Sequence, residues 1–323
     1  ASLVILEAPL HDDARFLRRL ADAVHSVRVG PATDPATMTG PLIGPPSAAL
    51  ERALTRLEPG ETWLVEPTRI DERTWTPGVR LGVRPGSWFH RTECFGPVLG
   101  VMRADDLDDA IAIQNASTFG LTGGIHSLDE AEVDHWLERI EVGNAYVNRH
   151  ITGAVVRRQP FGGWKRSSVG CGPKAGGPQY VAAFGAWSGG GDDADAFERV
   201  WRTEYAVDVD PSALACERNV LRHRPLARVA LAAGEGADPA ALATARLAAR
   251  VAGVELVEPG PAAERVRVVG HVGDDVLRGW RAAGLDVDLA PPVADARVEL
   301  RHWVREQSLS ITRHRHGRLL DAR

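Results

Sequence analysis

The sequence has few of the features that mark several large classes of protein. Its 323 residues include three cysteines, Cys94, Cys171 and Cys216, an odd number at distant positions. This argues against a disulfide framework and against a zinc site, so we expect no metal and a cytoplasmic location. No apolar run is long enough to cross a bilayer, so no transmembrane segment is expected. The formal net charge of −5 gives no electrostatic reason to expect a nucleic acid as partner.

Three further signals are missing from the chain. There is no initiator methionine, and residues 1–8 have no basic stretch before Glu7 interrupts their apolar run. We therefore expect no signal peptide, and we expect the chain to be a fragment of a longer protein or a processed one. A Gly-x-Gly-x-x-Gly phosphate loop is also absent, because Gly234-Glu-Gly236 lacks the third glycine.

The chain does contain an alternation of apolar, strand-like runs and amphipathic helical segments. In its first part, the expected elements are strands over 3–6, 98–102, 121–126 and 143–148, and helices over 105–115 and 129–140. Strands that alternate with helices imply right-handed crossovers and one parallel sheet. A further short strand is expected over 179–187.

A second region of the same kind follows a polar, glycine-rich stretch. Residues 188–193 read Ser-Gly-Gly-Gly-Asp-Asp, which is typical of a linker, and we place a domain boundary at 188–196. Beyond it, strands and helices alternate again, and 296–309 is expected to be helical. The sequence therefore predicts an α/β protein with a larger domain over 1–187 and a smaller one over 197–323.

Several motifs in the first domain occur in a fixed order. Thr92-Glu-Cys-Phe-Gly-Pro-Val98 and Gln159-Pro-Phe-Gly-Gly-Trp-Lys165 resemble two signature stretches of the aldehyde dehydrogenase superfamily. Three other segments, Pro85–Phe89, Val142–Val156 and Gly172–Pro178, resemble the L-glutamate-γ-semialdehyde dehydrogenase branch of that superfamily. That branch includes the bifunctional proline utilization A enzymes. Their longer members carry an extra C-terminal domain, which 197–323 resembles.

The resemblance carries expectations about fold and reaction. The fold would be the C-terminal portion of the parallel-sheet aldehyde dehydrogenase catalytic domain, followed by a smaller Rossmann-like domain with a structural role. The parent enzyme would be a homo-oligomer that uses NAD to oxidise the semialdehyde, formed from pyrroline-5-carboxylate, to glutamate in proline catabolism. FAD is expected only if a proline dehydrogenase domain lies upstream. The catalytic cysteine and the glutamate base would also lie upstream of Ala1, so no catalytic residue is expected in this chain.

Five residues match binding positions of the family. By resemblance, Glu93 would bind the nicotinamide ribose, and Phe95 would lie beside the nicotinamide ring. Gly153 and Ala154 would receive the α-carboxylate of the substrate on their backbone N–H groups, and Phe161 would pack on its aliphatic carbons. Each position also has a purely structural interpretation. The glutamate could simply be solvated, the two phenylalanines could pack in the core, and the glycine and alanine could belong to a turn that needs small residues.

Other readings stay open at this stage. Cys94 lies beside a carboxylate that would raise its thiol pKa, so a buried structural cysteine is favoured over a nucleophile. The isolated chain could be a non-catalytic binding or oligomerisation fragment. The parent enzyme could also be an aldehyde dehydrogenase of different specificity, and the choice between NAD and NADP is not set by these residues.

Overall fold

Two compact units divide the chain. The computed structural model describes residues 2–168, 172–315 and 318–319, so Cys171 lies outside the described residues. The first unit comprises Ala1–Thr118 with Asp129–Ile140, and the second comprises Phe119–Leu128 with Glu141–Arg323. Neither unit ends in the glycine-rich stretch, so the domains and the 188–196 linker expected from the sequence stay predictions.

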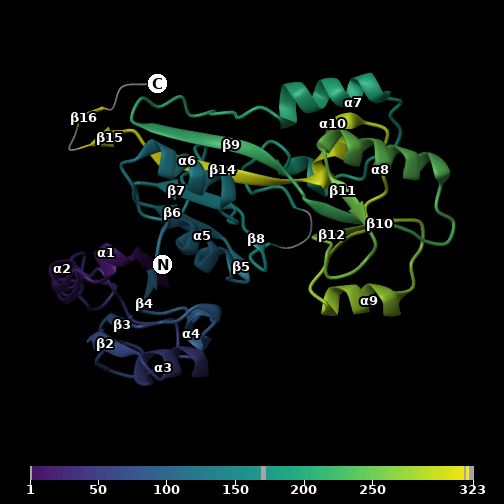
Figure 1. Ribbon diagram of the computed structural model, residues 1–323. Helices are drawn as coiled ribbons and strands as arrows, with labels where there is room; N and C mark the ends of the chain where they lie inside the picture. Colours follow the sequence, from purple (N-terminus) through teal and green to yellow (C-terminus); the bar gives the residue numbers. More distant parts are fainter. Residues whose placement is uncertain (1, 169–171, 316–317, 320–323) are drawn as a thin grey trace. The chain divides into compact units, whose positions relative to one another are not determined.

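A four-stranded sheet lies at the centre of the first unit (Figure 1). Its order is β1 (Leu3–Glu7), β4 (Val98–Ala104), β3 (Gly78–Leu81) and β2 (Thr62–Val65). The first three strands are parallel, and β2 is antiparallel to β3. The helices of this unit are α1 (Ala8–His11), α2 (Ala14–His25), α3 (Ala48–Thr55), α4 (Trp88–Arg91), α5 (Leu107–Asn115) and α6 (Glu130–Arg139).

Alternation along β4 builds a core on each face of this sheet. Val101 packs with Val79 and Leu6 on one face. Met102 packs with Phe89 on the other. This follows from the period of two, which sends neighbouring side chains to opposite faces of a strand.

One expectation about the sheets is wrong. The strand over 98–102 does not share a sheet with those over 121–126 and 143–148, because β4 pairs with β1 and β3 on its two edges. The other two strands, β6 (Thr122–Ile125) and β7 (Asn144–Val147), pair in parallel within the second unit. Periodicity identified each strand but not its partner.

The C-terminal part of the chain supplies a strand to the sheet that contains β6 and β7. This sheet has the order β6-β7-β14-β9, where β14 is Val304–Thr312 and β9 is Glu217–Pro225. β14 pairs antiparallel with β9 along its whole length, and its residues 308–311 pair in parallel with β7. The helix expected over 296–309 is therefore wrong beyond α10 (Ala296–Leu300) and a 3-10 turn (Arg301–Trp303), because the backbone of 304–312 pairs with β9 and that of 308–311 also pairs with β7.

The strand expected over 179–187 is also wrong. This segment forms a 3-10 helix, η1 (Val181–Phe184), and it belongs to no sheet among the described residues. A 3-10 helix satisfies its hydrogen bonds locally and leaves no strand edge. The homo-oligomer implied by the resemblance stays a prediction.

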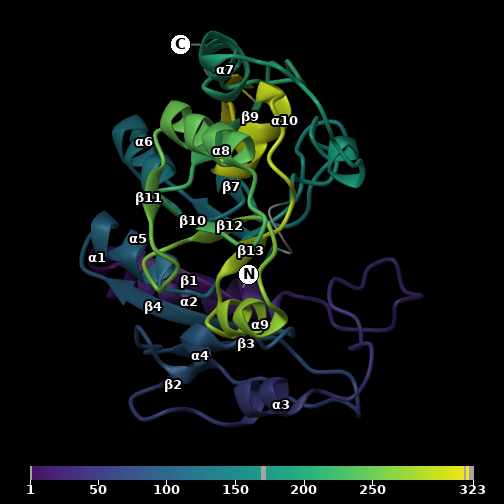
Figure 2. The ribbon, with the colours of Figure 1, turned by 90° about the vertical axis from the view of Figure 1, so that its right-hand side faces the viewer.

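The other four-stranded sheet of the second unit is fully parallel and matches the expected Rossmann-like pattern. Its order is β11 (Glu255–Val257), β10 (Arg228–Ala233), β12 (Arg265–Val269) and β13 (Asp286–Asp288). Figures 1 and 2 show α8 (Pro239–Ala252) and α9 (Asp274–Ala282) on opposite faces of it. The alanines of α8 pack with Val229, whereas Leu277 of α9 packs with Ala230.

Short elements complete the second unit. They are β5 (Phe119–Gly120), β8 (Trp164–Lys165), α7 (Ala194–Val200), a π-helical turn (Trp201–Tyr205), β15 (His314–Arg315) and β16 (Arg318–Leu319). Across the ranges that the structure describes, no helix combines the length and apolar character that a membrane span requires.

A buried ionic cluster ties β12 to the C-terminal helical turns. Arg267 is fully buried, and its Nη2 donates to both carboxylate oxygens of Glu299 at 3.0 and 2.9 Å. Its Nη1 lies 3.1 Å from Oδ2 of Asp288. Glu299 also accepts a hydrogen bond from Nε1 of Trp303 at 3.1 Å. Each charge in this cluster is compensated, which is the condition for keeping charges inside a core.

We expect Arg267→Met to destabilise the protein severely. The substitution leaves Asp288 and Glu299 buried without their cation, and removing one partner of a buried pair costs about 3–5 kcal/mol. Arg278→Met is a matched control, because Arg278 pairs with Asp275 on an exposed helix face and the loss should be at most about 1 kcal/mol. Urea unfolding of both variants measures the difference, and equal losses would contradict the analysis.

Candidate functional site

The segment Glu93–Phe95 leads into β4 in the first unit. Glu93 is exposed, and Phe95 is 84% exposed with a backbone φ of 57°. Non-glycine residues rarely adopt positive φ, and such strain often occurs at functional sites. The backbone thus holds an aromatic ring outside the core, so the core-packing reading of Phe95 does not hold here.

The first residues of the chain lie beside this segment. β1 pairs in parallel with β4, and the backbone N–H of Gly100 donates to the carbonyl of Ser2 at 2.9 Å. Parallel strands begin at the same edge of a sheet. The start of β1 and the segment that carries Glu93 therefore lie at one edge of the sheet.

Cys94 lies in the core, unlike its exposed neighbours Glu93 and Phe95. Its side chain is buried, and Sγ lies 3.7 Å from the carbonyl oxygen of Thr92. Burial raises the pKa of its thiol, and the positive charge of Arg80 opposes that shift only in part. A thiol in such surroundings is a poor nucleophile, which agrees with the structural role expected for Cys94.

The loop after β7 carries the candidate carboxylate-binding positions. Gly153 has a φ of 71° and, like Ala154, is exposed. The hydroxyl of Tyr146, a buried residue of β7, donates to the carbonyl of Gly153 at 2.8 Å. Asn148 and Arg157 in the same loop also have positive φ. The loop is therefore held in a conformation that its sequence alone would not favour.

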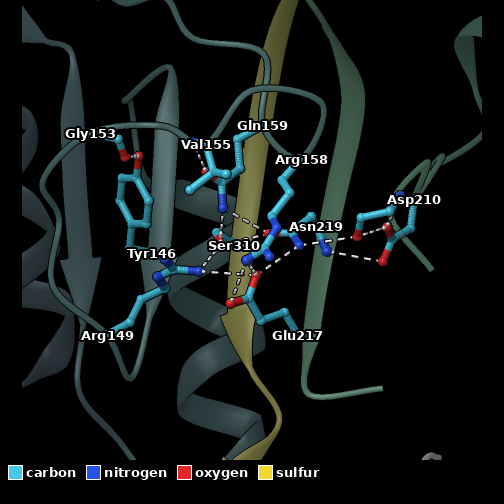
Figure 3. Close-up of polar contacts among 11 residues, drawn as sticks. Tyr146, Arg149, Gly153, Val155, Arg158, Gln159, Asp210, Glu217, Asn219 and Ser310 are labelled. Carbon is cyan, nitrogen blue, oxygen red and sulfur yellow. Dashed lines mark hydrogen bonds and ion pairs between the residues drawn. The ribbon is translucent and has the colours of Figure 1, made fainter. Parts of the chain in front are cut away.

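A polar network holds the far side of this loop (Figure 3). Oε1 of Gln159 accepts from the backbone N–H of Val155 at 3.0 Å. Nε2 of Gln159 donates to Oδ1 of Asn219 on β9 at 2.9 Å and contacts Oγ of Ser310 on β14 at 2.7 Å. Gln159, Asn219 and Ser310 are all buried, so each needs these partners.

Two arginines extend the network through a shared carboxylate. Arg149 Nη1 donates to Oγ of Ser310 at 2.6 Å and lies 3.6 Å from Oε2 of Glu217. Arg158 Nη1 lies 3.3 Å from both carboxylate oxygens of Glu217. Burial raises the pKa of Glu217, but the hydrogen bond from Asn219 and the two arginine charges lower it below its usual value. Glu217 thus stays ionised and anchors both ends of the loop.

Phe161 follows this network directly. It is partly buried, and its backbone exchanges hydrogen bonds with Ala175 at 2.9 and 3.1 Å. Glu93 and Phe95 lie in the first unit, whereas Gly153, Ala154 and Phe161 lie in the second. The convergence of these two groups on one cleft stays a prediction.

The Rossmann-like sheet closes the place where a nucleotide would bind. In open α/β sheets that place is the carboxyl edge where the strand order reverses, here between β10 and β12. The loops after these strands pair through Glu235 and His271, with N–H···O distances of 2.8 and 2.9 Å. A Cβ at Gly234 would lie 2.1 Å from the carbonyl of His271. Since these N–H groups are already bonded, this sheet is poorly suited to hold a phosphate.

Comparison with known proteins agrees with the motifs. The model of the aldehyde dehydrogenase family matches residues 1–187. The chain belongs to this family. Among curated proteins it is similar to a 1-pyrroline-5-carboxylate dehydrogenase of Geobacillus sp. (strain WCH70), with 35% identity over 172 residues, 52% of this chain and 33% of that protein. The chain thus spans about a third of the length of the curated dehydrogenases it matches.

Solved structures extend the similarity to the second half of this aldehyde dehydrogenase chain. Proline utilization A from Corynebacterium freiburgense matches with a TM-score of 0.90 and 45% identity, over 99% of this chain and 36% of that one. A 1-pyrroline-5-carboxylate dehydrogenase from Thermus with bound NAD matches with a TM-score of 0.50 and 32% identity, over 57% of this chain and 35% of that one. The expected similarity to proline utilization A is confirmed, and it extends over nearly the whole of this chain.

Gln159→Leu should loosen the loop that carries Gly153 and Ala154. The change removes the acceptor of the Val155 N–H and leaves two buried polar side chains on β9 and β14 with fewer partners, at a cost of about 1–3 kcal/mol. Hydrogen exchange of the Val155 amide should become at least about tenfold faster. His150→Ala, at an exposed position of the same loop, should leave this exchange unchanged. Equal exchange in both variants would show that Gln159 does not hold the loop.

Proposed function

We propose that this chain is the portion of an NAD-dependent L-glutamate-γ-semialdehyde dehydrogenase that binds the nicotinamide end of the cofactor and the carboxylate end of the substrate. The parent enzyme oxidises the semialdehyde, which forms from 1-pyrroline-5-carboxylate, to glutamate in proline catabolism. The relatives named 1-pyrroline-5-carboxylate dehydrogenase and proline utilization A support this assignment.

One structural observation carries the proposal most directly. β1 and β4 are parallel neighbours, so the segment Glu93–Phe95 lies at the edge where β1 begins. By resemblance, the catalytic cysteine lies immediately before Ala1. A group placed there would be beside the residues expected to bind the nicotinamide ribose and ring. This is the arrangement that hydride transfer from a cysteine-bound substrate requires.

The residues at that edge fit a nicotinamide nucleotide. Glu93 offers an exposed carboxylate that can accept from both ribose hydroxyls, and Phe95 offers an exposed ring to the nicotinamide. NAD, when bound, supplies the acceptor for the hydride that leaves the aldehyde carbon. The role of Glu93 is to orient the ribose, and that of Phe95 is to cover one side of the ring and exclude water.

The loop around Gly153 fits the carboxylate of the substrate. The N–H groups of Gly153 and Ala154 donate to no acceptor within the described part of the chain, and both residues are exposed. Small side chains leave such N–H groups open to an anion. The loop is fixed by Tyr146 at one end and Gln159 at the other, so the donors are held in place before the substrate binds. Phe161 would pack on the aliphatic carbons of the substrate.

Ala154→Leu in the full-length enzyme tests the carboxylate site. A leucine side chain would cover the N–H donors, so KM for the semialdehyde should rise at least about tenfold, equivalent to about 1.4 kcal/mol. KM for a simple aliphatic aldehyde without a carboxylate should change little. Val156→Leu, at an exposed position of the same loop, is the matched control and should affect neither KM. A full-length enzyme that oxidises neither aldehyde would overturn the proposed function itself.

The rival reading is that the isolated chain is only a binding or oligomerisation fragment. An assay of residues 1–323 with NAD⁺ and semialdehyde should show no NADH formation, because the nucleophile and the base are expected upstream of Ala1. Adding the full-length enzyme to the same mixture confirms that the assay works. Turnover by the isolated chain would mean that one of its own groups, such as Cys94, acts as nucleophile. The proposal that the nucleophile lies upstream of Ala1 would then be wrong.

A further inference from the structure

One buried polar network of the second unit ends at Glu306 on β14. Its Oε2 accepts from the backbone N–H of Lys174 at 2.6 Å, and its backbone carbonyl accepts from Nε1 of Trp164 at 2.8 Å. The buried side-chain nitrogen of Lys174 donates to the carbonyl of Gly162, next to Phe161. Through these contacts, Glu306 fixes the segment that carries the Pro-Phe-Gly-Gly motif.

A second polar network ends at Arg301. Nε of Arg301 donates to Nε2 of His302 at 3.2 Å, and Nδ1 of His302 lies 2.7 Å from Oδ2 of Asp288. Burial lowers the pKa of His302, so its ring is neutral, with the proton on Nδ1 and the lone pair on Nε2. Asp288 in turn pairs with Arg267. Arg301 thus marks the end of the ionic cluster that stabilises the Rossmann-like sheet.

Both networks end at the same small cavity. Glu306 and Arg301 line it together with His223, Gln179, Val304, Gly172 and Pro173, and its volume is about 20 Å³. Among the residues that the structure describes, four buried atoms of the lining have no hydrogen-bond partner of good geometry: Oε1 of Glu306, Nη1 of Arg301, and Nδ1 and Nε2 of His223, whose ring has only a weaker contact with the backbone of Tyr205. The side chains of His223 and Glu306 are only 9% and 6% exposed. Buried polar atoms without a partner are rare in proteins, and their usual partner is an ordered water.

The chemistry of the lining restricts what can occupy the cavity. Arg301 can only donate, whereas the free carboxylate oxygen of Glu306 accepts. The guest must therefore accept and donate at once, which excludes a simple anion and a metal cation. Burial lowers the pKa of His223 to about 4, opposed by the nearby carbonyl of Tyr205 and the charge of Asp208, so its ring is neutral near pH 7. A neutral ring can serve as donor or acceptor.

The volume of the cavity and the distance between His223 and Glu306 both fit a single water molecule. A cavity of this volume is close to the roughly 10–15 Å³ that one water needs, and it is too small for an amino acid or a nucleotide fragment. Nε2 of His223 and Oε1 of Glu306 are 3.9 Å apart, too far for a direct hydrogen bond. A water about 2.8 Å from each atom spans that gap. We propose that the cavity holds one ordered water, which bridges Arg301, His223 and Glu306 and joins the two polar networks.

The bridge links two regions that are distant in sequence. On one side it supports Glu306, and through Lys174 the backbone of Gly162. On the other side it meets Arg301 and, through His302, the core of the Rossmann-like sheet. The water thus acts as a structural ligand shared by the motif segment and the C-terminal sheet, independently of the reaction proposed above.

A crystal structure of the full-length protein at high resolution tests the proposal. We expect one well-ordered water within hydrogen-bond distance of Glu306 Oε1, His223 Nε2 and Arg301 Nη1. An empty cavity, direct contact between His223 and Glu306, or an ion with coordination distances in this position would each overturn it. Soaking with a rubidium salt and with a bromide distinguishes water from ions, because an electron-rich ion that bound there would strengthen the density, whereas a site that holds only water should not change with either.

A pair of variants gives a second measurement in solution. His223→Leu removes the ring nitrogens, so the water should be lost and the melting temperature should fall by about 2–8 °C. His223→Gln keeps a donor and an acceptor in the same place and should recover at least half of that fall. If His223→Leu does not fold, the comparison of wild type with His223→Gln still decides, because the water should remain in the crystal structure of the glutamine variant. A glutamine variant without the water, or a leucine variant as stable as wild type, would contradict the proposal.

Discussion

The insertion of β14 between β7 and β9 is the constraint on which the second unit depends. β14 pairs on both edges, and its residues Gln307, Ser308 and Ser310 are buried although they are polar. Burying polar groups is tolerable only if their hydrogen bonds are complete. Ser310 meets this condition by contacting Gln159 and Asn219, and these contacts also fix the loop with the candidate carboxylate site. The packing of a strand and the shape of a site thus follow from one set of contacts.

The sequence predicts local elements well and their partners poorly. Strands and helices alternate in the Rossmann-like region as the sequence predicts, because alanine-rich α8 and valine-rich β12 carry strong local patterns. The expected helix over 296–309 fails because the pattern of 304–312, with buried serines and a buried glutamine, reflects contacts with residues far away in the chain. β9 is not predicted from the sequence for the same reason. Its polar residues Asn219 and Arg222 have their partners on β14 and in loop 149–159.

In the candidate site, too, the residues within motifs could be predicted, whereas the residues that hold them in place could not. Glu93, Phe95, Gly153, Ala154 and Phe161 could be named from motifs, since those stretches are local in sequence. Tyr146, Gln159 and Ser310 could not, because their role is to hold other residues and depends on the fold. Tyr146 could have been suspected, since a tyrosine in a strand expected to be buried needs a partner for its hydroxyl. The positive φ of Phe95 has no sequence signal at all, because glycine would be the ordinary choice there.

The distance along the sequence between β7 and β14 has a consequence for synthesis. Arg149 and Ser310, which hydrogen bond to each other, are separated by 161 positions. Contacts of such long range form late and slow folding. During translation, β7 must wait with one edge unpaired until the ribosome has released residues 304–312, and an unpaired edge invites aggregation. A cell that makes this protein must therefore synthesise residues 304–312 before the loop that follows β7 can take its final form.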